Sequence, residues 1–62
     1  MWCYRLELDI KLSNGEVTRN AKMNIVATNF DAAMQKLNAL SDKQNIEILK
    51  LECIDEFSVL IA

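Results

Sequence analysis

The sequence predicts one α+β domain over residues 1-62, built in the order strand, strand, helix, strand (ββαβ). Two hydrophobic patterns indicate this order: residues 2–12 alternate between apolar and polar, and residues 30–40 repeat their apolar positions at helical spacing. An Asn-Gly pair at 14–15 marks a turn after the first pattern. We therefore expect a three-stranded, mainly antiparallel sheet with the helix packed on one face.

The first predicted strand, residues 2–12, has one fully apolar face. That face carries Trp2, Tyr4, Leu6, Leu8, Ile10 and Leu12. Strict alternation is typical of an antiparallel strand that is buried on one side only.

The turn fixes the register of the second strand, because Asn14 and Gly15 suit the two positive φ values of a type I′ turn. The expected core-facing pairs are Leu12–Val17, Leu8–Ala21, Leu6–Met23, Tyr4–Ile25 and Trp2–Ala27. Arg19 would face Ile10, with its long side chain bending out to water.

The helix is predicted to begin with Thr28 as its N-cap and Asp31 three residues later, in the pattern of a capping box. Its apolar stripe comprises Phe30, Ala33, Met34, Leu37 and Leu40. We expect the helix to end near Ser41 and Asp42.

The third strand is predicted over residues 46–54, where the parity of the apolar residues changes. Either a β-bulge near Ile48 and Leu49 resets the phase, or both faces of this strand are covered. The uncharged residues 57–62 should extend this strand, pair as a short fourth strand or reach a second subunit. We prefer the sheet order second-first-third over first-second-third, because the first strand has the strictest pattern and the longest run.

The residue counts exclude most known types of catalytic site, since the chain has no His, no Pro, one Gly and two Cys. Without His, the usual general base, the Ser-His and Cys-His pairs and the commonest metal ligand are missing. Glu7 and Asp9 share a face, but basic side chains flank them, which predicts a salt-bridged surface rather than a catalytic pair. We expect no enzyme activity, no cofactor and no metal.

The largest side chains are expected in the core. They are Trp2, Tyr4, Phe30 and Met34. One helix over three strands leaves little volume for a cavity, so no small-molecule ligand is expected. No apolar run reaches the length of a membrane span and the start lacks a signal pattern, so we expect no membrane association and a cytoplasmic location with reduced thiols.

The charge is unevenly distributed, although the net charge is only −2, from 7 Lys+Arg and 9 Asp+Glu. Residues 47–62 hold one basic and four acidic side chains, so the acidic excess lies there. A nucleic-acid binder would carry the opposite charge, and no direct nucleic-acid binding is expected. An acidic edge beside an aromatic ring could dock on a basic protein surface; alternatively, these charges only keep an apolar strand soluble. The candidate partner-binding residues are Glu52, Asp55, Glu56 and Phe57.

The small size predicts self-association, because a domain of this length buries only about 60% of the surface of its unfolded chain. We expect a homodimer, formed where apolar residues gather on the outer face of the sheet and on the tail. The candidate self-association residues are Cys3, Val26, Ile48, Ile54, Val59 and Ile61.

The order of elements over residues 2–54 resembles that of the small phage-encoded uracil-DNA glycosylase inhibitors of ββαβ fold. Those proteins dimerise and block the DNA-binding cleft of the host enzyme. The resemblance implies a viral inhibitor of a host nucleic-acid-processing enzyme, and it assigns no individual site residue. We therefore expect a non-catalytic protein-binding module of this kind; the alternative is a structural homo-oligomerisation module without a separate target.

Overall fold

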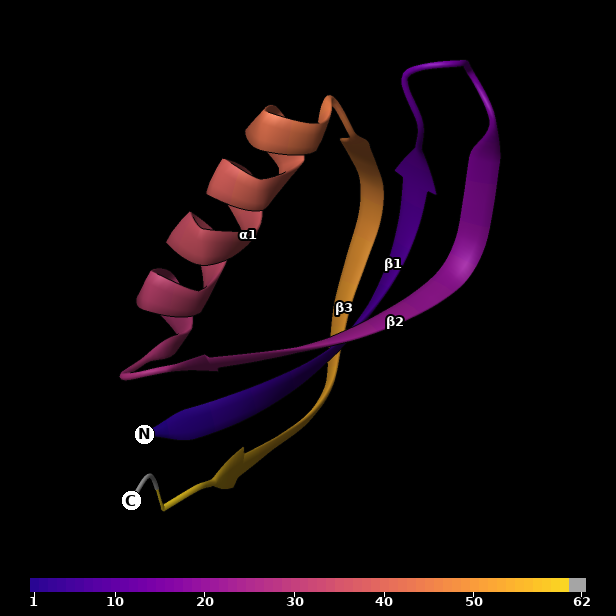
Figure 1. The fold of residues 1–62 in the computed structure, drawn as a ribbon. Coiled ribbons are helices and arrows are strands. Elements are labelled where there is room, and N and C mark those ends of the chain that lie inside the picture. Colours follow the sequence, from indigo (N-terminus) through magenta and orange to yellow (C-terminus); the bar gives the residue numbers. More distant parts are fainter. Residues whose placement is uncertain (61–62) are drawn as a thin grey trace.

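The structure is a computed structural model and describes residues 1–60. Strands β1 (Trp2–Lys11) and β2 (Val17–Ala27) are followed by helix α1 (Phe30–Gln44) and strand β3 (Glu47–Ser58). β1 lies in the centre of an antiparallel sheet of order β2-β1-β3, and α1 packs against one face (Figure 1). The predicted ββαβ fold and strand order are confirmed.

The hairpin has the predicted register away from its loop, from Trp2 opposite Ala27 to Leu8 opposite Ala21. The predicted type I′ turn is wrong. The N–H of Leu12 donates to the carbonyl of Glu16 at 2.8 Å, which closes a three-residue loop in which only Gly15 has a positive φ, of 90°. The side chain of Asn14 accepts a hydrogen bond from the Glu16 N–H instead of placing its own backbone in the left-handed region.

A β-bulge in β2 compensates for the longer loop. Thr18 rather than Arg19 faces Ile10, and the register shifts between Leu8 and Ile10. Asn20 occupies the left-handed region with a φ of 57°, and its N–H donates to the Asp9 carboxylate at 3.0 Å. The pairs predicted next to the loop, including Arg19 opposite Ile10, are therefore wrong by one residue, because one extra residue sits in the loop and another in the bulge.

The ends of α1 differ from those predicted. Asn29 is the N-cap in place of Thr28, and its side-chain oxygen accepts from the Ala32 N–H at 2.8 Å. The helix continues past Ser41 and Asp42 to Gln44 and ends at Asn45, whose φ of 53° is left-handed. Asparagine tolerates this conformation, so Asn45 takes the role that glycine often has at a helix end.

β3 contains the predicted bulge near Ile48 and Leu49, and a second one at Ile54. Each bulge reverses the parity of the strand, which explains why its apolar residues do not alternate cleanly. Of the three alternatives for the tail, extension of the third strand is found as far as Ser58, and the N–H of Val59 donates to the carbonyl of Met1 at 3.0 Å.

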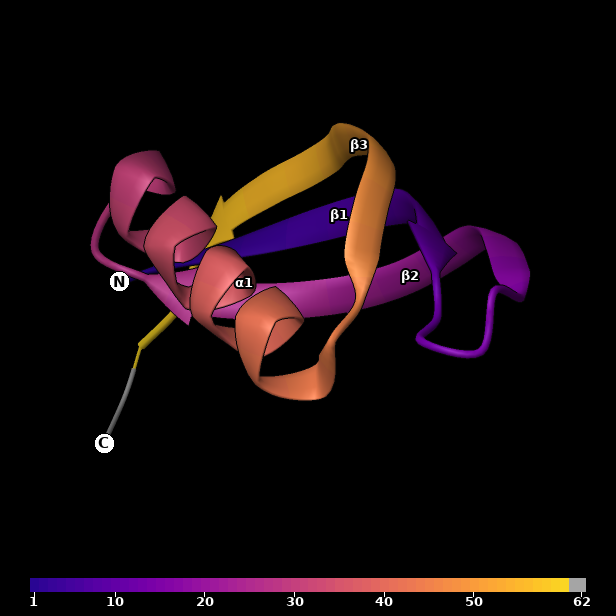
Figure 2. The ribbon, with the colours of Figure 1, turned by 90° about the horizontal axis from the view of Figure 1, so that it is seen from above.

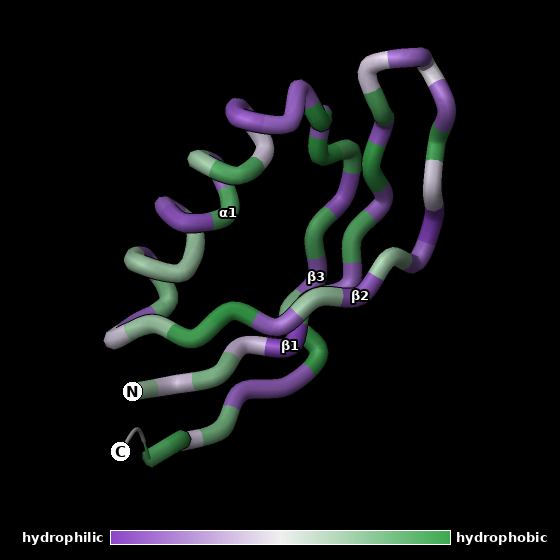
Figure 3. Tube along the Cα trace, viewed as in Figure 1, coloured by the Kyte–Doolittle hydropathy of each residue, from purple (hydrophilic) through white to green (hydrophobic). Residues whose placement is uncertain are grey.

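The core lies between α1 and the half of the sheet formed by β1 and β2. It comprises Tyr4, Leu6, Leu8, Ile25, Ala27, Ala33 and Leu37. α1 packs mainly against β2, and seen from above the second half of β3 lies beyond β1 on the side away from the helix, whereas its start lies beside the end of α1 (Figure 2). Apolar segments nevertheless continue along β3 (Figure 3), and none of its residues is buried.

Candidate protein-binding surface

Within residues 1–60, no three His, Cys, Asp or Glu side chains gather as a metal site requires. Cys3 is buried and Cys53 exposed, and both are free thiols. None of the helices in this part of the chain could cross a membrane.

The four aromatic residues of the chain lie near the start of β1, the start of α1 and the end of β3, which come together at one end of the molecule (Figure 1). We call Trp2, Tyr4, Phe30 and Phe57 the aromatic end. Tyr4 is buried and packs edge-on against Phe30, with 5.5 Å between ring centroids and an angle of 77° between the planes. Trp2, Phe30 and Phe57 remain 44%, 40% and 40% exposed. Large exposed aromatic side chains are typical of protein interfaces.

Trp2 and Phe30 are the functional candidates that the sequence analysis missed, because it placed both in the core. Trp2 begins β1 and Phe30 begins α1, so each stands at the edge of the helix-sheet interface. The sequence signal for their exposure was their position as the first residue of a strand or helix. A side chain at such a position can be covered by neighbouring residues on one side only.

Two of the candidate partner-binding acids join the aromatic end on opposite faces of the sheet. Glu56 is opposite Tyr4, on the face that α1 covers in part, whereas Asp55 and Phe57 lie on the outer face opposite Arg5 and Cys3. Burial raises the pKa of the Tyr4 phenol, and the charges of Glu56 and Cys53 raise it further. The pairing of Glu56 with Tyr4 places this carboxylate beside the phenol ring.

Glu52, the remaining candidate acid, lies apart from the other candidate partner-binding residues. The bulge at Ile54 separates it from Asp55, and it faces Glu7 near the middle of β1. The four predicted partner-binding residues therefore do not form one contiguous patch.

The candidate self-association residues are likewise divided between surfaces. Cys3 and Val26 are paired on the outer face, but Cys3 is buried. Ile48 faces Ile10 and packs against the core on the helix side. Val59 follows β3 at the aromatic end, and Ile61 lies outside the described residues.

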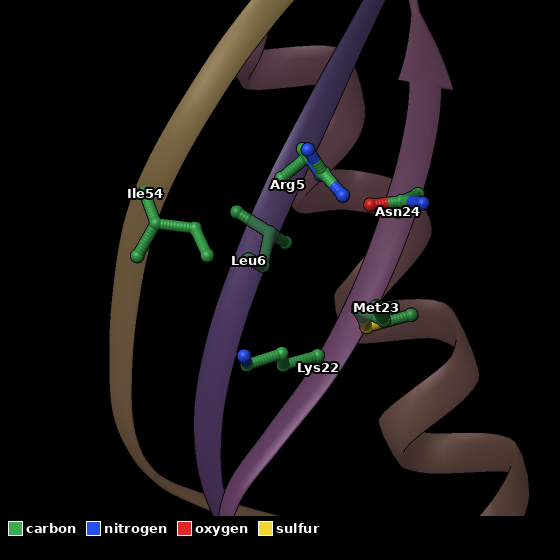
Figure 4. Close-up of a pocket in the computed structure, with 6 residues that line it drawn as sticks. All are labelled: Arg5, Leu6, Lys22, Met23, Asn24 and Ile54. Carbon is green, nitrogen blue, oxygen red and sulfur yellow. The ribbon is translucent and has the colours of Figure 1, made fainter.

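Ile54 forms one wall of a shallow hollow of about 360 Å³ on the outer face (Figure 4). The hollow is lined by Arg5, Leu6, Lys22, Met23, Asn24 and Ile54. Arg5 and Lys22 extend over it as exposed cations, which gives the outer face a mixed, solvated character in this region.

A second, apolar groove of about 180 Å³ lies on the other side of the sheet, under the last turns of α1. Its walls include Ile10, Leu40, Ile46 and Ile48. Its lining residues lie near the end of β1, the end of α1 and the start of β3, away from the aromatic end, so the two features are separate surfaces.

Comparison with protein-family models, with curated proteins and with solved structures yields no match for this chain. The resemblance to the phage-encoded inhibitors accordingly still depends on the order of elements alone.

Proposed function

We propose that this chain is a non-catalytic module that binds another protein through its aromatic end. The observation that carries the proposal is the exposure of Trp2, Phe30 and Phe57, each at 40% or more, at one end of a small domain. Burial of exposed aromatic rings is the usual source of hot-spot energy in protein interfaces. The absence of histidine from the chain supports a role in binding rather than catalysis.

The charges around the aromatic end favour a basic target. Asp55 and Glu56 lie within β3 beside Phe57, and Asp31 lies in the first turn of α1. Lys36 is occupied, because its ammonium group donates to the carbonyl of Val26 at 2.6 Å. Arg5 lies opposite Asp55 on the outer face, so the acidic charge of the aromatic end is concentrated at Glu56 and Asp31, where it complements a basic surface such as a cleft that normally holds nucleic acid.

The finer form of the proposal is therefore inhibition of a nucleic-acid-processing enzyme, as in the phage proteins that the element order resembles. Uracil-DNA glycosylase is the first target to test. Stoichiometric amounts of the chain should suppress cleavage of uracil-containing DNA, and more DNA substrate should relieve the inhibition. If uracil-DNA glycosylase keeps its full activity at a large excess of the chain, it is not the target. The general binding role would then be tested by affinity capture alone.

Affinity capture with matched variants tests the general role. The immobilised wild-type chain should retain a stoichiometric protein that added duplex DNA displaces. Asp55→Asn combined with Glu56→Gln should weaken this complex by about 10-fold, because the variant loses two charges opposite a basic surface. Phe57→Ala should weaken it by at least as much.

The matched control is Glu16→Gln combined with Asp42→Asn, which removes the same charge at the opposite end of the molecule. This control should bind like the wild type. Equal retention by the control and by the Asp55 and Glu56 variant would show that the aromatic end is not the binding surface. Because Trp2 and Phe57 lie on opposite faces, comparing Trp2→Ala with Phe57→Ala also identifies the face in contact.

A further inference from the structure

Strand β3 offers an unprotected edge. It forms one side of the sheet, all but one of its residues are exposed, and its contact with the core on the helix side is at Ile48. The bulges at Leu49 and Ile54 limit the regular part of the strand to residues 50–53. Leu51, in this regular part, is 38% exposed on the helix side, opposite the buried Leu8. An edge of this kind can pair with another strand unless something covers it.

The two charged residues beside Leu51 have no ionic partner within the described chain. Lys50 faces Asp9, but the Asp9 carboxylate already accepts from Arg19 and from the backbone N–H of the β2 bulge. Glu52 faces Glu7, a residue of like charge. Across residues 1–60, the ion pair between Arg19 and Asp9 is the only one. Like charges opposite each other in a sheet are unfavourable, so Glu52 would gain from a cation on its free side.

We infer that β3 pairs antiparallel with β3 of a second copy of this chain, about a two-fold axis through Leu51. In this register Lys50 of each copy lies opposite Glu52 of the other, and the two Leu51 side chains meet at the axis. The inference goes beyond the proposed function, because it concerns the edge of β3 and not the aromatic end.

Geometry selects this register among the neighbouring ones. Directly opposite residues in an antiparallel pair share a face, so a strand can pair with its own copy only about an axis perpendicular to the sheet that passes through one residue. An axis through Lys50 or Glu52 would set like charges against each other. An axis through Leu51 instead gives two Lys–Glu pairs and one apolar contact.

The position of α1 is compatible with this dimer. A two-fold axis perpendicular to the sheet places both helices on the same face of a six-stranded sheet. Each helix begins beside its own β2 and ends beside the start of its own β3 (Figure 2). Because the two β3 strands run antiparallel about Leu51, the C-terminal ends of the two helices lie at opposite ends of the paired strands. The exposed Leu51 and Cys53 side chains of both copies then line the space between the helices.

Charge reversal tests the register. Sedimentation equilibrium at high micromolar concentration should give the wild type twice its monomer mass of 7.1 kDa. Lys50→Glu and Glu52→Lys should each raise the dissociation constant by about 10-fold, because each creates two like-charge contacts across the axis. The double variant with both reversals should restore the dimer to within about 3-fold of the wild type.

The controls are Lys43→Glu and Glu16→Lys, which make the same charge changes at exposed positions away from β3. Both should dimerise like the wild type, and circular dichroism should show all variants folded. A monomeric wild type, or single reversals that leave the mass unchanged, would overturn the inference. So would a double variant that stays dissociated, since it would exclude pairing of Lys50 with Glu52. Target capture by the aromatic end would be unaffected by any of these results.

Discussion

Strands β2 and β3 flank the same central strand, yet only β2 contributes buried residues to the core. β2 buries Ile25 and Ala27, which α1 covers, whereas β3 buries nothing. The cause is geometric: a helix is about 10 Å across, strands lie about 4.8 Å apart, and one helix therefore covers about two strands. β3 is nonetheless rich in Leu, Ile and Phe, although only Ile48 of this strand packs against the core, and both proposed binding surfaces use the strand.

The largest expected difference between the two sides is in core packing. Leu37 of α1 is 4% exposed and packs on the β2 side, and Leu51 of β3 is 38% exposed. Leu37→Ala should cost about 3 kcal/mol. That loss is comparable to the whole stability of a domain this small, so the variant should be largely unfolded. Leu51→Ala should cost about 1 kcal/mol or less.

The free energy of unfolding of both variants can be measured by urea unfolding followed by circular dichroism. Low micromolar protein concentration keeps the chains monomeric in this measurement. Similar losses for Leu37→Ala and Leu51→Ala would mean that α1 covers β3 as well as β2, and the comparison between the two strands would fail.

A smaller effect is expected at the start of α1, the element that makes the two sides different. Asn29→Ala removes the side-chain acceptor of the Ala32 N–H and should cost about 1 kcal/mol. Thr28→Ala, one residue earlier, is the matched control and should change the free energy of unfolding by a few tenths of a kcal/mol. The same urea measurement checks both. A larger loss for Thr28→Ala than for Asn29→Ala would restore Thr28 as the N-cap.

The positions of the hairpin and the helix were predictable, because in these segments the local sequence preferences and the pattern of buried residues favour the same structure. Alternation over β1 fixed both the buried face and most of the pairing with β2. The loop and the bulge at Asn20 were not predictable from propensity, because Asp9 stabilises the bulge from the neighbouring strand. Two one-residue errors cancelled, which is why the register beyond the bulge was still correct.

The candidate binding surfaces were less predictable, because exposure depends on which strands the single helix covers. The excess of apolar residues and the acidic charges on β3 were visible in the sequence. The separation of Glu52 from Asp55 was not visible, since it results from the bulge at Ile54. The exposure of Trp2 likewise depends on where α1 begins relative to the end of the sheet.

The smallest expected effect is at Tyr4, which lies on the boundary between the covered and uncovered sides. Its ring packs against Phe30 of α1, while Glu56 and Cys53 of β3 contribute negative charge. Burial, the larger cause, and these charges raise the phenol pKa above its ordinary value of 10.0. Tyr4 is the only tyrosine in the chain, so its titration can be followed directly by ultraviolet absorbance.

The raised pKa has a definite consequence for stability. The folded state holds the phenol proton more tightly than the unfolded state, so the contribution of Tyr4 is fully present below pH 10.0. It is lost as the pH rises from there through the pKa of the folded state. Tyr4→Phe should remove this part of the alkaline loss, while the loss due to lysine titration stays in both proteins. Glu56→Gln should lower the phenol pKa by part of the shift; a phenol that titrates at or below 10.0 in the folded wild type would show that β3 leaves the ring open to water.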